Sequence, residues 1–281
     1  MLSAVSRPRG LASAPLQIGS GTRALVTGAS RGIGRALAHE LAARGATVGL
    51  VARSITDLEA VAAELPGAHH VLVADVALRE SVLAAVEEFV AATGGLELLV
   101  VNAGVAHYEA IATQHIEKIE RMTEVNWLGT VYTIKAALPH MLVKRRGHIV
   151  VMSSGAGLRS FPGAAAYSAT KAAQRMFAEA LRHELAGSGV SLTTVYPSEI
   201  DTSLHDHQGQ GALPSWYRGG DQAAPPTELA KRVVKAVERD SRDLYWKGSV
   251  RGMSLLNGVS PRLADIVLRR LRGASAAPRR D

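Results

Sequence analysis

Short apolar runs alternate along this chain with longer segments in which apolar and polar residues mix. The short runs are rich in Val, Leu and Ile, which is typical of buried strands. The longer segments repeat apolar residues every three or four positions, the period of a helix that buries one face. The predicted strands span residues 23–28, 47–53, 70–76, 96–104, 147–154, 190–197 and 243–246. The predicted helices span residues 35–45, 55–67, 79–93, 115–143, 165–187 and 227–239.

This alternation predicts an α/β fold built on a parallel sheet. Parallel strands need crossover connections, and the crossover helices cover both faces of the sheet. We therefore expect a single domain, residues 22–250, with a three-layer, doubly wound Rossmann sheet of about seven strands. In such a sheet the ligand binds at the carboxyl ends of the strands.

Three segments fall outside the regular pattern. Residues 1–21 contain Arg and Ser but no acidic residue, and we interpret them as a flexible leader, with a transit peptide as the alternative. Residues 203–226 are rich in Gly and Pro and too long for an ordinary connection. They follow a strand end, where ligands bind, so we favour a substrate lid over a surface insertion. Residues 251–281 form a basic C-terminal extension.

The net charge of +7 is concentrated at the two ends of the chain. Residues 1–39 hold five Arg and no acid, whereas residues 251–281 hold seven Arg and two acids, so the middle is net negative. The middle shows no basic face with aromatic residues for stacking, which argues against nucleic-acid binding. The chain has no Cys, which excludes disulfides and fits a reducing compartment, and we predict a cytoplasmic location.

Three glycines lie between the first predicted strand and the first predicted helix. Gly28, Gly32 and Gly34 would let a phosphate approach the backbone, and the start of the helix offers unpaired N–H groups to it. A tight turn without a ligand is the alternative. The place of the glycines in the first strand–helix turn favours a dinucleotide site.

The residues around this turn predict which dinucleotide binds. Many NAD-binding folds carry an acidic residue at the end of the second strand, where it binds the ribose 2′-OH. Here that strand ends at Arg53 without a carboxylate, and Arg31 lies in the glycine turn. Two guanidinium groups would favour a 2′-phosphate, so we predict NADP(H) rather than NAD(H).

With these residues in view, the chain resembles the short-chain dehydrogenase/reductase family over about residues 22–250. "TGASRGIG" at 27–34 resembles its cofactor turn, and "YSATK" at 167–171 resembles its Tyr-x-x-x-Lys motif. The other matching stretches are "ADV" with Asp75, "NAG" at 102–104, "EVNWLGT" with Asn126, "SS" at 153–154 and "YPSEIDTS" at 196–203. Two positions depart from the pattern, since Val101 replaces a frequent Asn and Ser198 replaces a Gly.

The resemblance implies a set of site residues. We expect no metal site, because the adjacent residues His205, Asp206 and His207 have no obvious fourth ligand. The implied catalytic residues are Asn126, Ser154, Tyr167 and Lys171. The implied cofactor-binding residues are Gly28, Ser30, Arg31, Gly32, Ile33, Gly34, Arg53, Asp75, Val76, Asn102, Ala103, Gly104, Tyr167, Lys171, Pro197, Ile200 and Thr202. Ser154 is preferred to Ser153 because it precedes Tyr167 by thirteen positions, the usual separation in the family.

Tyr167 and Lys171 can act as a proton-transfer pair. Residues four apart lie on one face of a helix, so the two side chains point the same way. A free tyrosine has a pKa of about 10, and we expect Lys171 and an oxidised nicotinamide to lower it. Tyr167 would then donate a proton to a carbonyl or accept one from an alcohol. By resemblance, Ser154 orients the substrate oxygen, Lys171 binds the nicotinamide ribose and Asn126 supports a water relay.

Other residues leave alternatives open. His107 and Tyr108 follow the "NAG" turn and either contact the substrate or are ordinary loop residues. Residues 261–273 have the pattern of a basic amphipathic helix, which would lie on an anionic membrane surface, on its own domain or on a partner subunit. By resemblance, the helices at 115–143 and 165–187 form the contacts of a homodimer or homotetramer.

The sequence thus predicts an NADPH-dependent oxidoreductase. We expect it to transfer hydride between the nicotinamide and a ketone, aldehyde or secondary alcohol, with an apolar small molecule as substrate. An NAD-linked alcohol dehydrogenase is the alternative enzyme, and a dinucleotide-binding sensor or interaction protein without turnover is the alternative outside catalysis.

Overall fold

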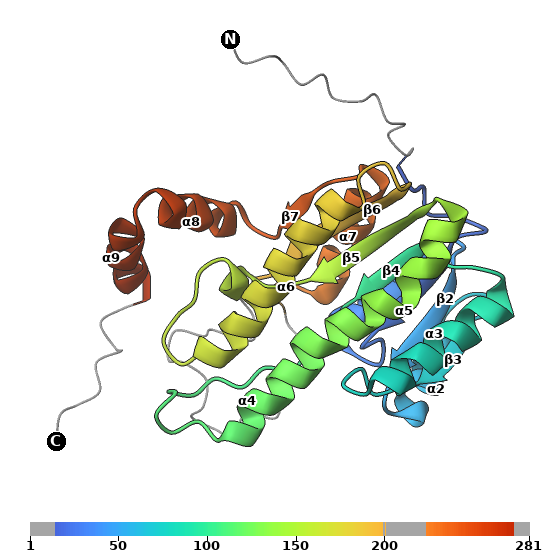
Figure 1. The fold of residues 1–281 in the computed structure, drawn as a ribbon, viewed down its shortest axis with the longest axis horizontal. Helices are drawn as coiled ribbons and strands as arrows, with labels where there is room; N and C mark the ends of the chain where they lie inside the picture. The colour runs from blue at the N-terminus through green and yellow to red at the C-terminus, as the bar shows by residue number, and fades with distance from the viewer. Residues whose placement is uncertain (1–14, 199, 201–222, 273–281) are drawn as a thin grey trace, which may run out of the picture.

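Seven parallel strands form the centre of the molecule (Figure 1). The computed structural model describes residues 15–198, 200 and 223–272. The strand order is β3-β2-β1-β4-β5-β6-β7. The strands are β1 (Arg23–Thr27), β2 (Thr47–Ala52), β3 (His70–Val73), β4 (Leu98–Val101), β5 (Gly147–Met152), β6 (Val190–Tyr196) and β7 (Asp243–Tyr245). All neighbouring strands of this sheet pair in parallel, so the predicted doubly wound sheet is confirmed.

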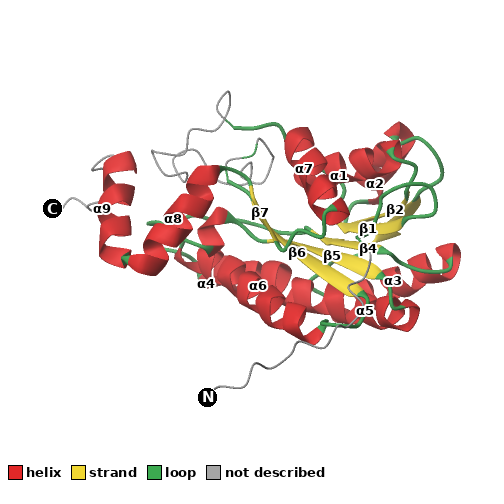
Figure 2. Ribbon diagram, turned by 90° about the horizontal axis from the view of Figure 1, so that it is seen from above, coloured by secondary structure: helices red, strands yellow, loops and turns green. Residues whose placement is uncertain are grey.

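Helices cover both faces of this sheet (Figure 2). One layer holds α1 (Gly32–Ala43), α2 (Ile55–Glu64) and α7 (Pro226–Glu238), and the other holds α3 (Arg79–Thr93), α5 (Gly129–Lys144) and α6 (Ala165–Glu184). Each layer buries its own apolar cluster against the strands. Along β4 the side chains alternate, because Leu98 and Val100 join one cluster while Leu99 and Val101 join the other. This double burial is why the strands read as continuous apolar runs.

The long helix predicted at 115–143 is divided into three parts. It consists of α4 (Ile116–Met122), a π-helical turn η1 (Thr123–Leu128) and α5. The π-helical turn carries Asn126. Such turns widen a helix by one residue and occur often at functional sites.

The C-terminal region holds a helix that the sequence pattern did not predict. Two helices, α8 (Gly248–Val259) and α9 (Pro261–Arg272), follow β7. Three glycines within α8 lower its helix propensity, which hides it in the sequence. Both helices lie to one side of the sheet (Figure 1). None of the helices in the described ranges is long and apolar enough to cross a bilayer.

The ends of the expected leader and lid can be compared with the structure. Of the leader at 1–21, residues 15–21 are described, and here the chain packs on the domain rather than away from it. Leu16 is 6% exposed in the core beside α7, and the side-chain amide of Gln17 donates to the Glu238 carbonyl at 3.2 Å. Of the lid, residues 203–222 lie outside the described ranges. Its flanks meet, since Ile200 forms a parallel bridge with Ala224.

A buried histidine at the start of β5 predicts an acid-dependent loss of stability. His148 is 1% exposed, and its Nε2 lies 2.8 Å from the Thr193 hydroxyl. Burial lowers the pKa of His148 to about 4, against the weaker opposing effect of Asp240. Between pH 6.5 and 4 the unfolded chain therefore binds a proton that the folded chain does not, and stability falls as the pH falls.

We expect His148→Gln to remove this part of the pH dependence. The contribution integrates to roughly 3 kcal/mol between pH 6.5 and 4. Urea unfolding of wild type and variant at pH 7 and at pH 4.5 measures this contribution. The Asp and Glu carboxylates affect both proteins alike, so the difference between the two proteins reports on His148. An equal loss of unfolding free energy in the two proteins would show that His148 does not titrate in this range.

Candidate active site

The predicted site residues gather at the carboxyl ends of β1, β4 and β5. The glycine turn joins β1 to α1, residues 102–104 follow β4, and Ser153 and Ser154 follow β5. Tyr167 and Lys171 come from α6, whose first turns lie beside the Ser154 segment. Parallel strands bring these positions to one edge of the sheet, so residues far apart in sequence become neighbours.

The glycine turn is closed tightly against the end of β4. Gly28 has φ +67°, and a Cβ there would lie 2.9 Å from the Ala103 Cα. A Cβ on Gly34 would meet the Gly28 carbonyl oxygen and would lie 2.6 Å from the Asn102 side-chain nitrogen. That nitrogen donates to the Thr27 carbonyl at 2.9 Å. These positions admit no larger residue, and they bring the backbone of the turn and the start of α1 together, as a pyrophosphate site requires.

Two arginines lie at the mouth of this turn. Arg31 precedes the first residue of α1, and it and Arg53, just after β2, are both exposed. Gly32 has φ +56° at the start of the helix. The backbone cradle, the helix start and the exposed cationic side chains fit a nicotinamide dinucleotide.

Asp75 has a partner that the sequence did not indicate. Its carboxylate accepts from Arg121 of α4 at 2.9 Å and from the Ala77 amide at 3.0 Å. Burial acts to raise the pKa of Asp75, but the Ala77 amide, Arg121 and Arg53 outweigh it and hold the pKa below its ordinary value. Arg121 lies 46 positions away, and no motif marks it. Asp75 thus stays ionised next to Arg53. The Arg53 guanidinium therefore has an acidic neighbour that the sequence pattern did not indicate.

The remaining predicted cofactor residues are placed as follows. Ile33 is partly buried against the core, and Val76 is buried and packs against Gly129. The Pro197 carbonyl accepts from the Gly155 amide at 2.8 Å, which ties the end of β6 to the Ser154 segment. Ser30 and Ala103 are partly buried in their turns, and Ile200 is buried. Thr202 lies outside the described residues.

Tyr167 and Lys171 both lie in the interior. Each is 5% exposed, and the Lys171 Nζ lies 5.9 Å from the centroid of the Tyr167 ring. The ammonium donates to the Met152 carbonyl at the end of β5, at 2.9 Å. A Cβ on Gly104 would lie 3.5 Å from the Nζ, so the turn after β4 covers the lysine directly.

The expected lowering of the Tyr167 pKa is wrong for the protein alone. Burial raises the pKa of Tyr167 to about 12, and hydrogen bonds with Ser154 and Tyr108 oppose it only in part. Burial also lowers the pKa of Lys171 to about 7, so this side chain is only partly charged at neutral pH. We had counted the attraction between the two groups but not the cost of removing each from water.

The two neighbouring serines have different partners. The Ser153 hydroxyl donates to the Lys171 carbonyl at 2.8 Å. The Ser154 oxygen accepts from the Ala156 amide at 3.1 Å and is hydrogen-bonded with Tyr167. Ser154 is therefore the serine next to the tyrosine hydroxyl, and its catalytic role stays a prediction.

Asn126 is fully buried, and its side chain fastens the segment after β4. Its Oδ1 accepts from the Val105 amide at 2.8 Å, and its Nδ2 donates to the Val105 carbonyl at 2.9 Å. The same Nδ2 donates to the Thr170 hydroxyl at 3.0 Å, on α6. Asn126 therefore links the segment after β4 to the helix that carries Tyr167.

Among the described residues, Tyr108 and Phe161 are aromatic side chains that pack against the apolar cluster that contains Tyr167. The Tyr108 ring meets the Tyr167 ring edge to face, with centroids 5.4 Å apart, and it contacts Phe161 at 5.6 Å. The sequence left the role of Tyr108 open, and nothing in it pointed to Phe161. Only the folded chain brings these two segments together.

The C-terminal helices contact the segment that carries Ser154. A Cβ on Gly155 would lie 3.5 Å from the Val250 side chain of α8. Arg159, four residues further along, forms an ion pair with Asp265 of α9. The two C-terminal helices α8 and α9 therefore brace the segment that carries Ser154 through two separate contacts.

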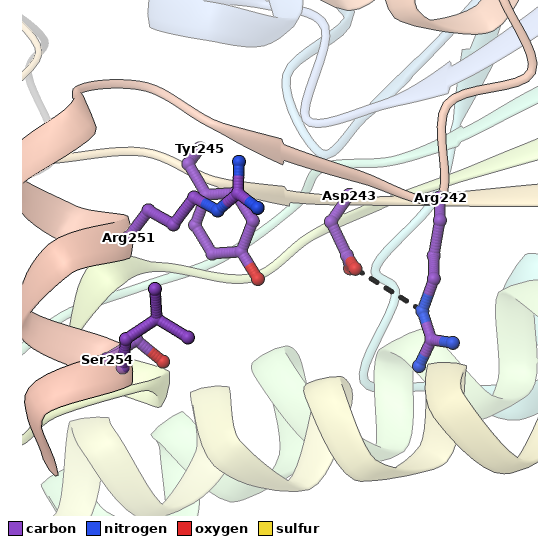
Figure 3. Close-up of a pocket in the computed structure, with 6 residues that line it drawn as sticks. Arg242, Asp243, Tyr245, Arg251 and Ser254 are labelled. Atoms are coloured by element: carbon purple, nitrogen blue, oxygen red, sulfur yellow. Dashed lines mark ion pairs between the residues drawn. The ribbon is translucent and has the colours of Figure 1, made fainter. Parts of the chain in front are cut away.

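A separate pocket of about 370 Å³ lies between β7 and α8 (Figure 3). Arg242, next to Asp243, and Arg251, over the Tyr245 ring, line it with Ser254 and Leu255. None of the predicted catalytic residues lines this pocket, so we assign it no part in the chemistry.

Known proteins share this sequence pattern and this fold. The profile of the short chain dehydrogenase family matches residues 22–212. An uncharacterized oxidoreductase from Myxococcus xanthus is 39% identical over 184 residues, which are 64% of this chain and 73% of that protein. The mouse dehydrogenase/reductase SDR family member 7B is 32% identical over 244 residues, 82% of this chain and 75% of that protein.

Solved structures of dehydrogenases share this fold. A short-chain dehydrogenase from Streptomyces avermitilis superimposes with a TM-score of 0.77 at 27% identity, covering 89% of this chain and 97% of the other. An alcohol dehydrogenase from Thermococcus sibiricus, complexed with 5-hydroxy-NADP, gives 0.71 at 29% identity, covering 80% and 94%. The match of the family profile extends over the glycine turn and the Tyr-x-x-x-Lys helix alike. The chain belongs to the short-chain dehydrogenase/reductase family, and it is an oxidoreductase that acts between CH–OH and C=O groups with a nicotinamide dinucleotide.

Proposed function

We propose that this protein is an NADPH-dependent reductase of ketones or aldehydes, acting reversibly on the corresponding alcohols. The observation that carries the proposal is the convergence of Ser154, Tyr167 and Lys171 beside the glycine turn, with Ser154 hydrogen-bonded to Tyr167. An intact set of this kind argues against a sensor without turnover. The aromatic side chains around Tyr167 favour an apolar substrate.

The chain offers a distinct group for each part of the coenzyme. The glycine turn and the start of α1 would hold the pyrophosphate, and Arg31 and Arg53 would hold a ribose phosphate. Lys171, beneath Gly104, would bind the nicotinamide ribose. When bound, the nicotinamide supplies or accepts a hydride at the substrate carbon.

Tyr167 supplies the proton that the substrate oxygen receives during reduction. With its pKa raised to about 12 by burial, the hydroxyl keeps its proton at neutral pH and suits a general acid in the reduction direction. Ser154 would hold the substrate oxygen against that hydroxyl. In the oxidation direction the phenolate is needed, so we expect alcohol oxidation to increase with pH.

A panel of ketones and aldehydes, followed by loss of NADPH absorbance, tests this proposal. We expect turnover of apolar carbonyl compounds with NADPH and much slower turnover with NADH. Tight NADPH binding without hydride transfer to any member of the panel would instead support the dinucleotide-binding sensor. Equal rates with both coenzymes would contradict the preference for NADPH, and faster turnover with NADH would favour the NAD-linked alcohol dehydrogenase.

Assembly, membrane contact and a cytoplasmic location stay predictions. On the two long helices, Val143 of α5 and Met176 of α6 are exposed apolar side chains that would suit a subunit contact. On the C-terminal pair, Leu255 and Ile266 are exposed among basic residues, which would suit an anionic membrane surface.

A further inference from the structure

Tyr108 lies directly against the proposed proton donor. Its ring is nearly perpendicular to the Tyr167 ring, at 89°, with the centroids 5.4 Å apart. On another side it packs on Phe161, with the centroids 5.6 Å apart. Edge-to-face aromatic pairs prefer this geometry, so the Tyr108 ring has a defined place between two neighbours.

The backbone on both sides of Tyr108 is fastened. The Gln114 side-chain amide donates to the His107 carbonyl at 3.2 Å, and the Glu109 amide donates to the Gly163 carbonyl at 2.8 Å. The Glu109 carboxylate also forms an ion pair with Lys118 at 3.1 Å. A side chain held in this way acts on its neighbour with little loss of conformational entropy.

The ring contact holds the Tyr108 side chain against Tyr167, and hydrogen bonding with Tyr108 and with Ser154 lowers the pKa of Tyr167 against the larger effect of burial. Among the described residues, the titratable side chains near Tyr167 are Tyr108, from the segment after β4, and Lys171, from its own helix. Ala106, Met122 and Ala156, which share its apolar cluster, carry no charge. A donor in this dry surrounding has a larger effect on a phenolate than it would have in water.

We propose that Tyr108 is a positioning residue for proton transfer: it donates a hydrogen bond that orients the Tyr167 hydroxyl and stabilises its phenolate form. This inference rests on the proposed role of Tyr167 as the acid and base of the reaction. Tyr108 adds a third hydroxyl to the pair formed by Ser154 and Tyr167. Its effect is largest in alcohol oxidation, because that direction needs the phenolate.

The test is Tyr108→Phe, which keeps the ring and removes only the hydroxyl. We expect the pH profile of alcohol oxidation to move about one unit towards alkaline pH, because the phenolate loses a donor. At neutral pH the kcat for oxidation should fall about tenfold, with KM changed less than about twofold. Tyr132→Phe, on α5, is the matched control and should leave the pH profile and the kcat of alcohol oxidation unchanged.

A second readout follows the ionisable hydroxyl of Tyr167 itself by NMR. With tyrosine labelled by ¹³C at Cζ, the resonance that disappears in Tyr167→Phe should shift in Tyr108→Phe and stay in place in Tyr132→Phe. If Tyr108→Phe behaves like wild type in both readouts while Tyr167→Phe is inactive, the inference fails and the proposed function stands. If Tyr167→Phe remains active, the proposed function itself fails.

Gln114→Met covers the case in which Tyr108→Phe does not fold. It removes the hydrogen bond to the His107 carbonyl and leaves both tyrosines in the chain. We expect a smaller alkaline shift of the same profile, because Tyr108 is then less firmly held. An unchanged profile in this folded variant would contradict the role of Tyr108.

Discussion

Tyr167→Phe should lower kcat for carbonyl reduction by about a thousandfold, within the range found for removal of a general acid. The variant keeps the ring in its buried place but has no proton to give to the substrate oxygen. Steady-state rates with NADPH and the best substrate of the panel measure the effect. NADPH affinity, followed by fluorescence titration, should change little, since the phenylalanine ring still fills the site.

The control for this prediction is Tyr132→Phe, the same change in a partly buried tyrosine of α5. It should keep the wild-type rate. Thermal unfolding shows whether Tyr167→Phe is folded, and loss of the hydrogen bonds with Ser154 and Tyr108 should cost about 1 kcal/mol each. A folded Tyr167→Phe that retained more than about a tenth of the wild-type kcat would remove Tyr167 from its proposed role.

Arg53→Asp should reverse the coenzyme preference. The change removes a guanidinium and introduces a carboxylate that repels a 2′-phosphate and can bind a ribose 2′-OH instead. We expect the Kd for NADPH to rise about thirtyfold or more, corresponding to roughly 2 kcal/mol for a lost charge-assisted hydrogen bond, while the Kd for NADH falls. Direct binding titrations of both coenzymes measure the two constants.

Arg79→Asp is the matched control for this charge reversal. Arg79 is exposed at the start of α3, where it pairs with Glu80. Its substitution changes the net charge equally but lies in no predicted cofactor contact, so both dissociation constants should stay within about twofold. If Arg53→Asp also left the NADPH constant unchanged, the proposed preference for the phosphorylated coenzyme would be wrong.

The sheet could be predicted because burial on both faces leaves a direct record in the sequence. Strands such as β4 and β5 are apolar at nearly every position, and local capping and glycine signals bound the helices between them. The pattern failed where local propensity and tertiary packing disagree. The glycines of α8 weaken its helical signal, and the π-helical turn that carries Asn126 looks like ordinary helix at the level of periodicity.

In the candidate site, only the residues that lie within recognisable sequence motifs could be predicted. The glycine turn, Ser154 and the Tyr167–Lys171 pair stand in recognisable stretches. Arg121 and Phe161 do not, because their roles come from contacts between segments far apart in the chain. The raised pKa of Tyr167 was missed for a related reason, since burial is a property of the folded chain and not of a four-residue spacing.

The bracing of the Ser154 segment by α8 and α9 has a consequence for protein engineering and for divergence among relatives. Through Gly155 and Arg159, α8 and α9 contact the segment that carries Ser154, the serine proposed to orient the substrate. We therefore expect an exchange of α8 and α9 between homologues to change the substrate range while leaving the proposed proton-transfer residues untouched. For the same reason, an affinity tag fused after α9 should be controlled for whenever rates are compared.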